Sequence, residues 1–185
     1  DVFCHCRRLK CVAFAEGSRL EKLGAYCFSH STLERTVIPK GVKELCEGAF
    51  NECGSLAEVV FEENSSLKEI GEHAFRACSG LGNISLPEGL KKIDKDCFRE
   101  SGLEEIIVPK SVTTIGYDAF SQCGKLKRVA FQKGSRVRRL DCCCFHCVGL
   151  EEFVAPPKLR AICDAALYEC SGLRRVVLNK GLEAL

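Results

Sequence analysis

The chemically most versatile side chains of this chain are its cysteines, fifteen of 185 residues. Their densest group is the run Cys142-Cys143-Cys144-Phe145-His146-Cys147. Thiolate and imidazole are preferred zinc ligands, but zinc sites usually combine paired ligands at spacings such as C-x₂-C with a second pair elsewhere. The repeat described below also commits Cys144 to the interior. Convergence of Cys143, His146 and Cys147 stays an open alternative, and we expect no metal and no other cofactor.

Two cysteine–histidine pairs have the residue types of a nucleophile and its general base, Cys147 with His146 and Cys27 with His30. Neither pair has an identifiable acid to orient the histidine, or donors that would stabilise an oxyanion. Every repeat of the chain is built alike, and no insertion between repeats forms a pocket. We therefore expect no catalytic residues and no enzymatic activity.

An internal repeat must position all of these side chains. An opening leucine recurs at spacings of 24, 23, 25, 22, 23, 24 and 23 residues. These leucines are Leu9, Leu33, Leu56, Leu81, Leu103, Leu126, Leu150 and Leu173. One such unit cannot bury its own apolar residues, whereas stacked units place equivalent leucines over one another and form a continuous core. The repeat therefore predicts a solenoid.

Each unit opens with a pattern such as Leu-x-x-Ile-x-Leu, whose alternate residues point inward as in a short strand. A proline such as Pro109 often follows, as expected where a strand ends, because proline cannot donate to a ladder. A second apolar pair comes next, for example Val112 and Ile115. Length varies only in the turn after the strand and in the stretch after the aromatic residue, as stacked coils require.

An aromatic residue lies five positions after the last residue of the second apolar pair. We expect the stretch around this aromatic residue to form a helical or 3₁₀ turn opposite the sheet. The column contains Phe28, Phe50, Phe75, Phe98, Phe120 and Phe145, with Leu167 in the last full unit. Eight cysteines lie just before it or three residues after it: Cys27, Cys97 and Cys144, then Cys6, Cys53, Cys78, Cys123 and Cys170. We expect buried, reduced thiols that act as small apolar side chains.

The repeats form one array, residues 1–185, with about seven full repeats and a partial repeat at each end. Residues 2–6 match the end of an earlier unit, and the unit that opens at Leu173 stops at Leu185. Solenoids need polar caps, and none is visible, so we expect a monomeric fragment of a longer protein. A weaker candidate metal group lies in the partial repeat at the N-terminal end. It consists of Cys4-His5-Cys6 together with Cys11.

The unit from Leu103 to Cys123 has the pattern Leu-x-x-Ile-x-Val-Pro-x-x-Val-x-x-Ile-Gly-x-x-Ala-Phe-x-x-Cys. It resembles the BspA-like class of leucine-rich repeats, also called the Treponema pallidum class, over essentially the whole chain. The resemblance implies an α/β repeat solenoid: a curved right-handed coil with a parallel β-sheet on its concave side and short helical or 3₁₀ turns opposite. It also implies protein binding or adhesion, no catalytic residues, and a cell-surface or secreted location. The many unpaired-looking cysteines are compatible with an intracellular location instead.

The charge balance of the chain does not indicate any particular class of partner. A formal net charge of +2 requires neither nucleic acid nor an anionic membrane. No apolar run approaches the ~20 residues that span a bilayer. Residues 125–139 hold seven basic and no acidic residues, yet Lys127-Arg128 lies between Glu104-Glu105 and Glu151-Glu152 in the repeat register. We expect ladders of opposite charge, no nucleic-acid partner and no membrane insertion.

The outward-facing residue in the middle of each opening strand is the candidate binding position. The column reads Ala13, Val37, Val60, Ser85, Ile107, Ala130, Val154 and Val177. β-Branched residues simply suit strands, but a contiguous apolar stripe bordered by charges also marks a partner site. We predict that a protein partner binds through Val37, Val60, Ile107, Ala130, Val154 and Val177. Two alternatives stay open, a structural spacer that carries another domain and a cysteine-based metal or redox module.

Overall fold

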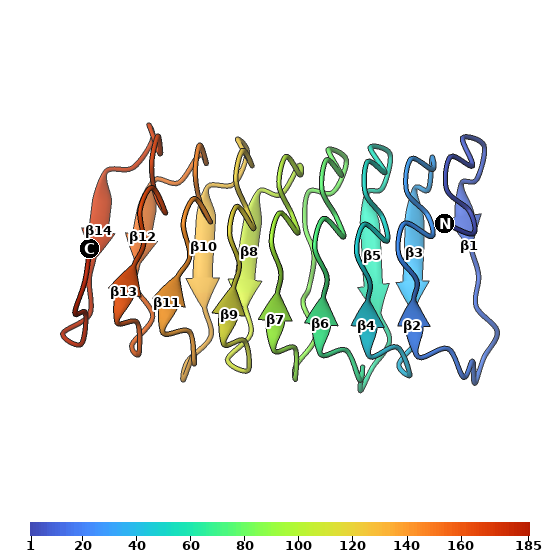
Figure 1. Ribbon diagram of the computed structural model, residues 1–185, viewed down its shortest axis with the longest axis horizontal. Helices are drawn as coiled ribbons and strands as arrows, with labels where there is room; N and C mark the ends of the chain where they lie inside the picture. Colours follow the sequence, from blue (N-terminus) through green and yellow to red (C-terminus); the bar gives the residue numbers. More distant parts are fainter.

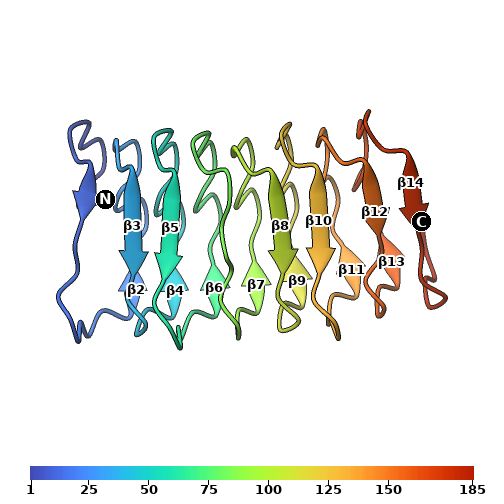
Figure 2. The same ribbon diagram turned by 180° about the vertical axis from the view of Figure 1, so that it is seen from behind.

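The computed structural model describes residues 1–185 as a row of stacked coils, with the two ends of the chain at opposite ends of the row (Figure 1). Each typical coil has a longer strand, a turn, a shorter strand and a second turn. The longer strands all point one way and the shorter strands point the other way, as Figures 1 and 2 show from opposite sides. The predicted solenoid is confirmed. Its handedness and curvature stay predictions.

The longer strands form the predicted parallel ladder. Equivalent residues of successive coils are partners, as in Val37 with Val60 and Ile107 with Ala130. The long strands are β1 (Cys11–Val12), β3 (Arg35–Ile38), β5 (Glu58–Phe61), β8 (Glu105–Val108), β10 (Arg128–Phe131), β12 (Glu152–Val154) and β14 (Arg175–Val177). They pair in the orders β1-β3-β5, β8-β10 and β12-β14. We call the surface they present the long-strand face.

A second parallel ladder, which the sequence pattern did not reveal, runs along the other side of the coils. Its strands are β2 (Lys22–Leu23), β4 (Glu44–Leu45), β6 (Glu69–Ile70), β7 (Lys92–Ile93), β9 (Thr114–Ile115), β11 (Arg139–Leu140) and β13 (Ala161–Ile162). They pair as β2-β4-β6-β7-β9 and β11-β13. Each strand has two residues, too few for an alternating pattern to indicate a strand.

The helical or 3₁₀ turns expected around the phenylalanines are wrong. In the coil that opens at Leu9, alternate N–H groups bond to different partners. Phe28 N–H donates to Ala49 O of the next coil, over 2.9 Å, whereas Ser29 N–H donates back to Tyr26 O. Tyr26 and His30 have φ of 52° and 55°, in the left-handed region. A helix requires successive residues to repeat the same hydrogen bond within the segment, and here every second N–H bonds to the next coil instead. No helix long and apolar enough to cross a membrane occurs.

The core is a set of columns that run the length of the array. Six phenylalanine pairs stack with ring centroids 5.2–5.4 Å apart, from Phe3 on Phe28 to Phe120 on Phe145. The opening leucines from Leu33 to Leu150 have no exposed surface. Because each ring is covered by the equivalent rings of its neighbours, stability depends on contacts between adjacent coils.

The coil that lacks the phenylalanine carries its aromatic ring elsewhere. Leu167 takes the aromatic place there, and the inward residue of the long strand in the same coil is Phe153 rather than an aliphatic residue. The Phe153 ring is fully buried, and its centroid lies 6.4 Å from that of Phe145. Aromatic volume has therefore moved from the turn to the strand of one coil, which keeps the interior filled.

Candidate functional site

The predicted stripe lies on the long-strand face and is exposed along most of its length. The exposed fractions are 36% for Val37, 39% for Val60, 55% for Ile107 and 47% for Val154. Ala130 and Val177 are half-buried. The neighbouring strand residues alternate with the stripe, since Ile106 and Phe153 are buried. The strand register is therefore as predicted, and a row of aliphatic side chains faces solvent.

Ion pairs between coils border the stripe on one side. Arg35 Nε lies 3.6 Å from Glu58 Oε2, Arg128 Nη1 lies 3.6 Å from Glu105 Oε2, and Arg175 bonds to Glu152. The pairs of Arg128 and Arg175 confirm the predicted opposite-charge ladders in part, since Glu104, Lys127, Glu151 and Arg174 form no ion pair. Within the basic stretch 125–139, however, only Arg128 and Arg139 form ion pairs, so the expected neutralisation is partial. Exposed pairs of this kind stabilise by only about 0–1 kcal/mol each, but they fix which charges a partner meets.

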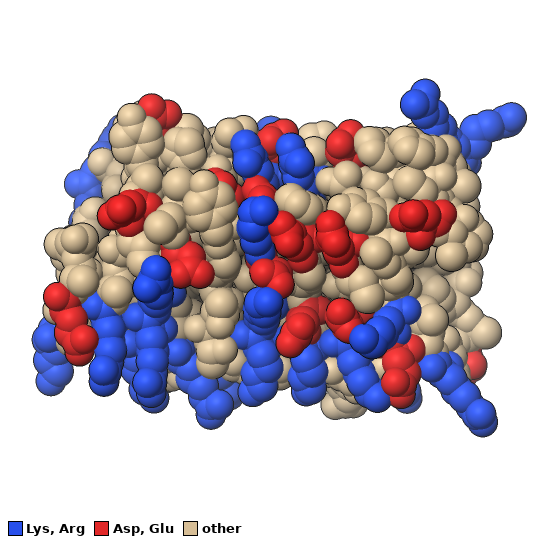
Figure 3. All heavy atoms as spheres, viewed as in Figure 1, with Lys and Arg blue, Asp and Glu red and all other residues tan.

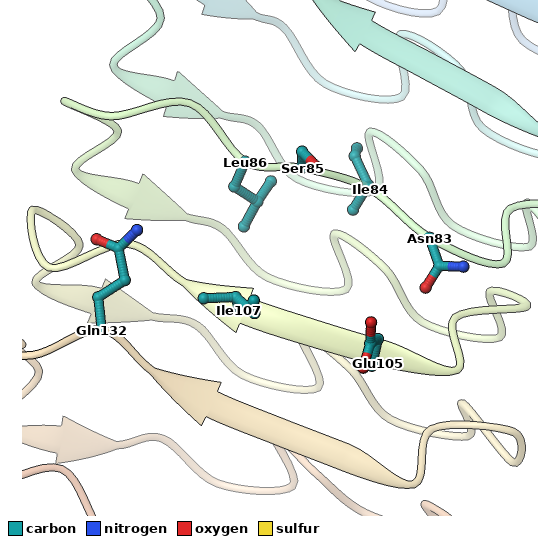
Figure 4. Close-up of a pocket in the computed structure, with 7 residues that line it drawn as sticks. All are labelled: Asn83, Ile84, Ser85, Leu86, Glu105, Ile107 and Gln132. Carbon is teal, nitrogen blue, oxygen red and sulfur yellow. The ribbon is translucent and has the colours of Figure 1, made fainter.

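The sheet opens at two places, and a hollow lies over each. Residues 83–86 form no strand, and a hollow of 260 Å³ separates them from Ile107 and Gln132 (Figure 4). β10 and β12 are not paired, and a hollow of 540 Å³ lies there beside Ala130 and Val154. The stripe therefore runs past two depressions of the surface.

The segment 83–86 offers hydrogen-bonding groups as well as space. The backbone groups of Asn83, Ile84, Ser85 and Leu86 make no backbone hydrogen bonds within the protein. Asn83 and Ser85 are exposed, and Ile84 is buried. Unpaired strand groups of this kind form a template for pairing with another polypeptide.

The face of the molecule seen in Figure 1 has a different distribution of charge from the long-strand face. Lys and Arg side chains gather along one long edge of that face, where the chain turns from the long strands to the short ones, and acidic side chains lie mainly above them (Figure 3). At the short strands, Lys22 of β2 lies 2.6 Å from Glu44 of β4, and Lys43, just before β4, lies 2.7 Å from Glu21.

The eight cysteines that lie just before the aromatic position of a repeat, or three residues after it, have a structural role beyond filling space. Cys27, Cys53, Cys78, Cys97, Cys123 and Cys144 are buried as predicted, and Cys6 and Cys170 are half-buried near the ends. Thiols three residues after the aromatic place donate to the carbonyl of the preceding coil's phenylalanine. The donations are from Cys53 to Phe28, Cys78 to Phe50, Cys123 to Phe98 and Cys170 to Phe145, over 2.9–3.2 Å. The column therefore favours a small donor.

The two candidate nucleophile pairs behave differently. Cys27 donates to Ala49 O, whereas His30 Nδ1 lies 3.1 Å from Glu52 Oε2, so these two residues serve different partners. Cys147 Sγ does lie 3.1 Å from His146 Nε2. A hydrogen bond to the Glu169 carboxylate, however, raises the pKa of the Cys147 thiol to about 11. A thiol that stays protonated at neutral pH is a poor nucleophile.

The metal-ligand types of the cysteine run converge in part. His146 belongs to two groups of potential ligand atoms, one with Asp118 and Cys143 and the other with Cys147 and Glu169. Sequence reasoning missed Glu169, although it occupies the same place after Leu167 as Cys147 does after Phe145. At the N-terminal end, His5 stacks on His30 with centroids 4.4 Å apart, and no ligand group forms there with Cys4, Cys6 or Cys11.

Comparisons with known proteins agree with this geometry. The family described as BspA type Leucine rich repeat region (6 copies) matches residues 1–101 and 68–185. No curated protein matches the chain.

Three solved structures resemble the fold. A leucine-rich repeat protein from Bacteroides ovatus ATCC 8483 has 28% identity and a TM-score of 0.73 over 87% of this chain and 42% of that one. A leucine rich cell surface protein from Faecalibacterium prausnitzii A2-165 has 30% identity and a TM-score of 0.71 over 78% of this chain and 38% of that one. The T. pallidum Leucine Rich Repeat protein has 28% identity and a TM-score of 0.66 over 80% and 71%. The chain spans about two fifths of the first two.

Proposed function

This chain belongs to the BspA-type leucine-rich repeat family, and we propose that it is a non-catalytic recognition scaffold that binds a protein partner through its long-strand face. The observation that carries the proposal is the exposed stripe of Val37, Val60, Ile107 and Val154. Apolar side chains gathered in one row favour a partner that covers them, because their burial is favourable by roughly 25 cal/mol per Å².

The surroundings of the stripe favour a polypeptide as the partner. The unpaired backbone groups of residues 83–86 lie across a hollow from Ile107, so a strand or loop could form hydrogen bonds there while covering the isoleucine. The ion pairs of Arg35, Arg128 and Arg175 border the same row. An apolar centre with a charged rim is the usual arrangement of a protein interface.

Two finer features belong to this proposal. A cell-surface, adhesive role is supported by the Faecalibacterium prausnitzii relative, which is named a leucine rich cell surface protein. A passive spacer is the alternative, since the chain spans only 42% and 38% of two of its relatives. A spacer needs no exposed aliphatic row, so the stripe favours recognition.

A photo-cross-linking experiment tests the proposal. A photoreactive amino acid would replace Ile107 on the long-strand face, and a matched control would replace the exposed Glu52 on the turns. Each protein would be mixed with cells and extracts of the source organism, irradiated, and analysed by mass spectrometry. We expect a discrete adduct from position 107 that Val154→Asp removes. Equal adducts from both positions, or none from position 107, would contradict binding by this face.

A further inference from the structure

We propose that His146, Cys147 and Glu169 form a binding site for a zinc-like divalent cation on the turns opposite the long-strand face. The potential ligand atoms of the three side chains all lie within 4.8 Å of one another. Cys147 Sγ lies 3.1 Å from His146 Nε2 and 3.0 Å from Glu169 Oε2, and the remaining pair, His146 Nε2 and Glu169 Oε2, is 3.8 Å apart. This inference is independent of the proposed recognition function.

The separations suit one tetrahedral ion. Zinc binds sulfur at about 2.3 Å and nitrogen or oxygen at about 2.0–2.2 Å, so tetrahedral ligand atoms lie roughly 3.4–3.7 Å apart. The observed distances bracket that range. Side-chain rotations that move the ligand atoms by about half an ångström or less would bring all three distances into it. Coordination by zinc would release the Cys147 proton to solvent, so that the resulting thiolate, the His146 imidazole and the Glu169 carboxylate bind the ion and water fills the fourth position.

The backbone and a neighbouring side chain hold the ligands in place. Cys147 N–H donates to Tyr168 O over 2.9 Å, which ties the coil of Cys147 to the coil of Glu169. Cys147 and Glu169 occupy equivalent turn positions, with φ of 53° and 56°. His146 Nδ1 lies 3.4 Å from Oγ of the buried Ser121. If Nε2 binds the ion, the Nδ1–H group donates to this hydroxyl, an outer contact that orients metal-bound histidines.

Electrostatics favour this group over two others of similar composition. Asp118, Cys143 and His146 also converge, but Asp118 lies 3.9 Å from the Arg99 guanidinium, which already supplies a positive charge. In the group of Glu72, His73 and Asp96, both carboxylates lie within 4 Å of the Lys95 ammonium. Glu169 has no lysine or arginine within ion-pair distance. Its carboxylate is therefore free to neutralise a metal ion.

Titration of the reduced, purified chain with Co²⁺ tests the site, because thiolate-bound Co²⁺ absorbs in the near ultraviolet and tetrahedral Co²⁺ has strong visible bands. We expect one equivalent to produce both features and Zn²⁺ to displace it. Cys147→Ser should abolish the thiolate band, and Glu169→Gln and His146→Gln should each weaken binding at least about tenfold. Cys143→Ser is the matched control and should bind as the original chain does. Circular dichroism of each variant would show that the coil stays folded.

Three results would overturn the proposal. The first is the absence of any tetrahedral spectrum at one equivalent. The second is a spectrum that survives Cys147→Ser, since the ion would then sit on other thiols. The third is loss of the spectrum in Cys143→Ser with retention in Glu169→Gln, which would assign the ion to the group that contains Asp118.

Discussion

The thiol of Cys78 donates a hydrogen bond to the backbone carbonyl of Phe50 in the preceding coil, with 3.1 Å between sulfur and oxygen. Cys78 is fully buried, so no water competes for that carbonyl. Cys53 and Cys123 make the same bond, and Ser31 and Ser101 occupy the same place in other coils. The cysteine column therefore joins adjacent coils by donation, in addition to the packing that its small apolar character predicts.

Replacing Cys78 separates these two contributions. Cys78→Val keeps an apolar side chain that the column already tolerates at Val148, but it removes the donor and should destabilise by about 1–3 kcal/mol. Cys78→Ser keeps a donor and should cost less. Urea unfolding of both variants measures the difference. A serine variant that is less stable than the valine variant would show that the column selects only for apolar volume.

The buried thiols should make stability depend on alkaline pH. Burial raises the pKa of Cys123 from its ordinary value near 9 to about 11 in the folded chain. Between these values the unfolded chain releases the proton and the folded chain keeps it, so the free energy of unfolding should fall as pH rises through this window. Denaturant unfolding from pH 8 to pH 11 measures the slope, and Cys123→Ser should reduce it. An unchanged slope in that variant contradicts the assignment.

The same burial should protect the thiols from alkylation. Cys78, Cys97 and Cys144 have pKa values raised well above the ordinary value by burial, and thiolate is the reactive form. Iodoacetamide at pH 8 should label the exposed Cys11 quickly and these three only after unfolding. Mass spectrometry of denatured but unreduced chain would also test the reduced state. Disulfides at Cys53, Cys78 and Cys123 would contradict it and indicate an oxidising compartment.

The exchanged aromatic ring in the coil of Leu150 gives a coupled prediction. Phe153→Ile should leave a cavity and cost about 1–3 kcal/mol, and Leu167→Phe should overfill the same interior at a similar cost. The double variant restores the arrangement of the other coils and should be more stable than the sum of the single changes implies, by at least about 0.5 kcal/mol. Thermal unfolding of the four proteins measures this coupling. Simple additivity would mean that the two sites do not share space.

The sequence predicts some features of this fold well because they repeat. Leu103, Ile106 and Phe120 each recur at fixed spacing, so coil length, the long strands and the direction of Ile107 follow from one periodic pattern. The short strands and the turns do not follow from it. Lys22–Leu23 is too short for alternation to indicate a strand, and hydrogen bonds between coils, such as Phe28 N–H to Ala49 O, decide the turn.

The candidate sites also divide into features that the repeat register predicts and features that it does not. The outward column was visible in the register, whereas the unpaired segment 83–86 was not, because its residues fit the strand pattern as well as those of Glu105–Val108. Glu169 could have been placed beside Cys147 by comparing residues two after the aromatic place in successive units. Distances between ligand atoms depend on side-chain rotation, which no repeat pattern specifies.

The most direct test of recognition by the long-strand face is the affinity of the cross-linked partner for the double variant Ile107→Asp/Val154→Asp. Both side chains are exposed, so circular dichroism and unfolding should match the original chain, whereas Ile106→Asp, at a buried neighbour, should unfold it. Two central anchors worth more than about 1 kcal/mol each predict at least about thirtyfold weaker binding by calorimetry. A folded double variant that binds the partner as tightly as the original chain would contradict the account.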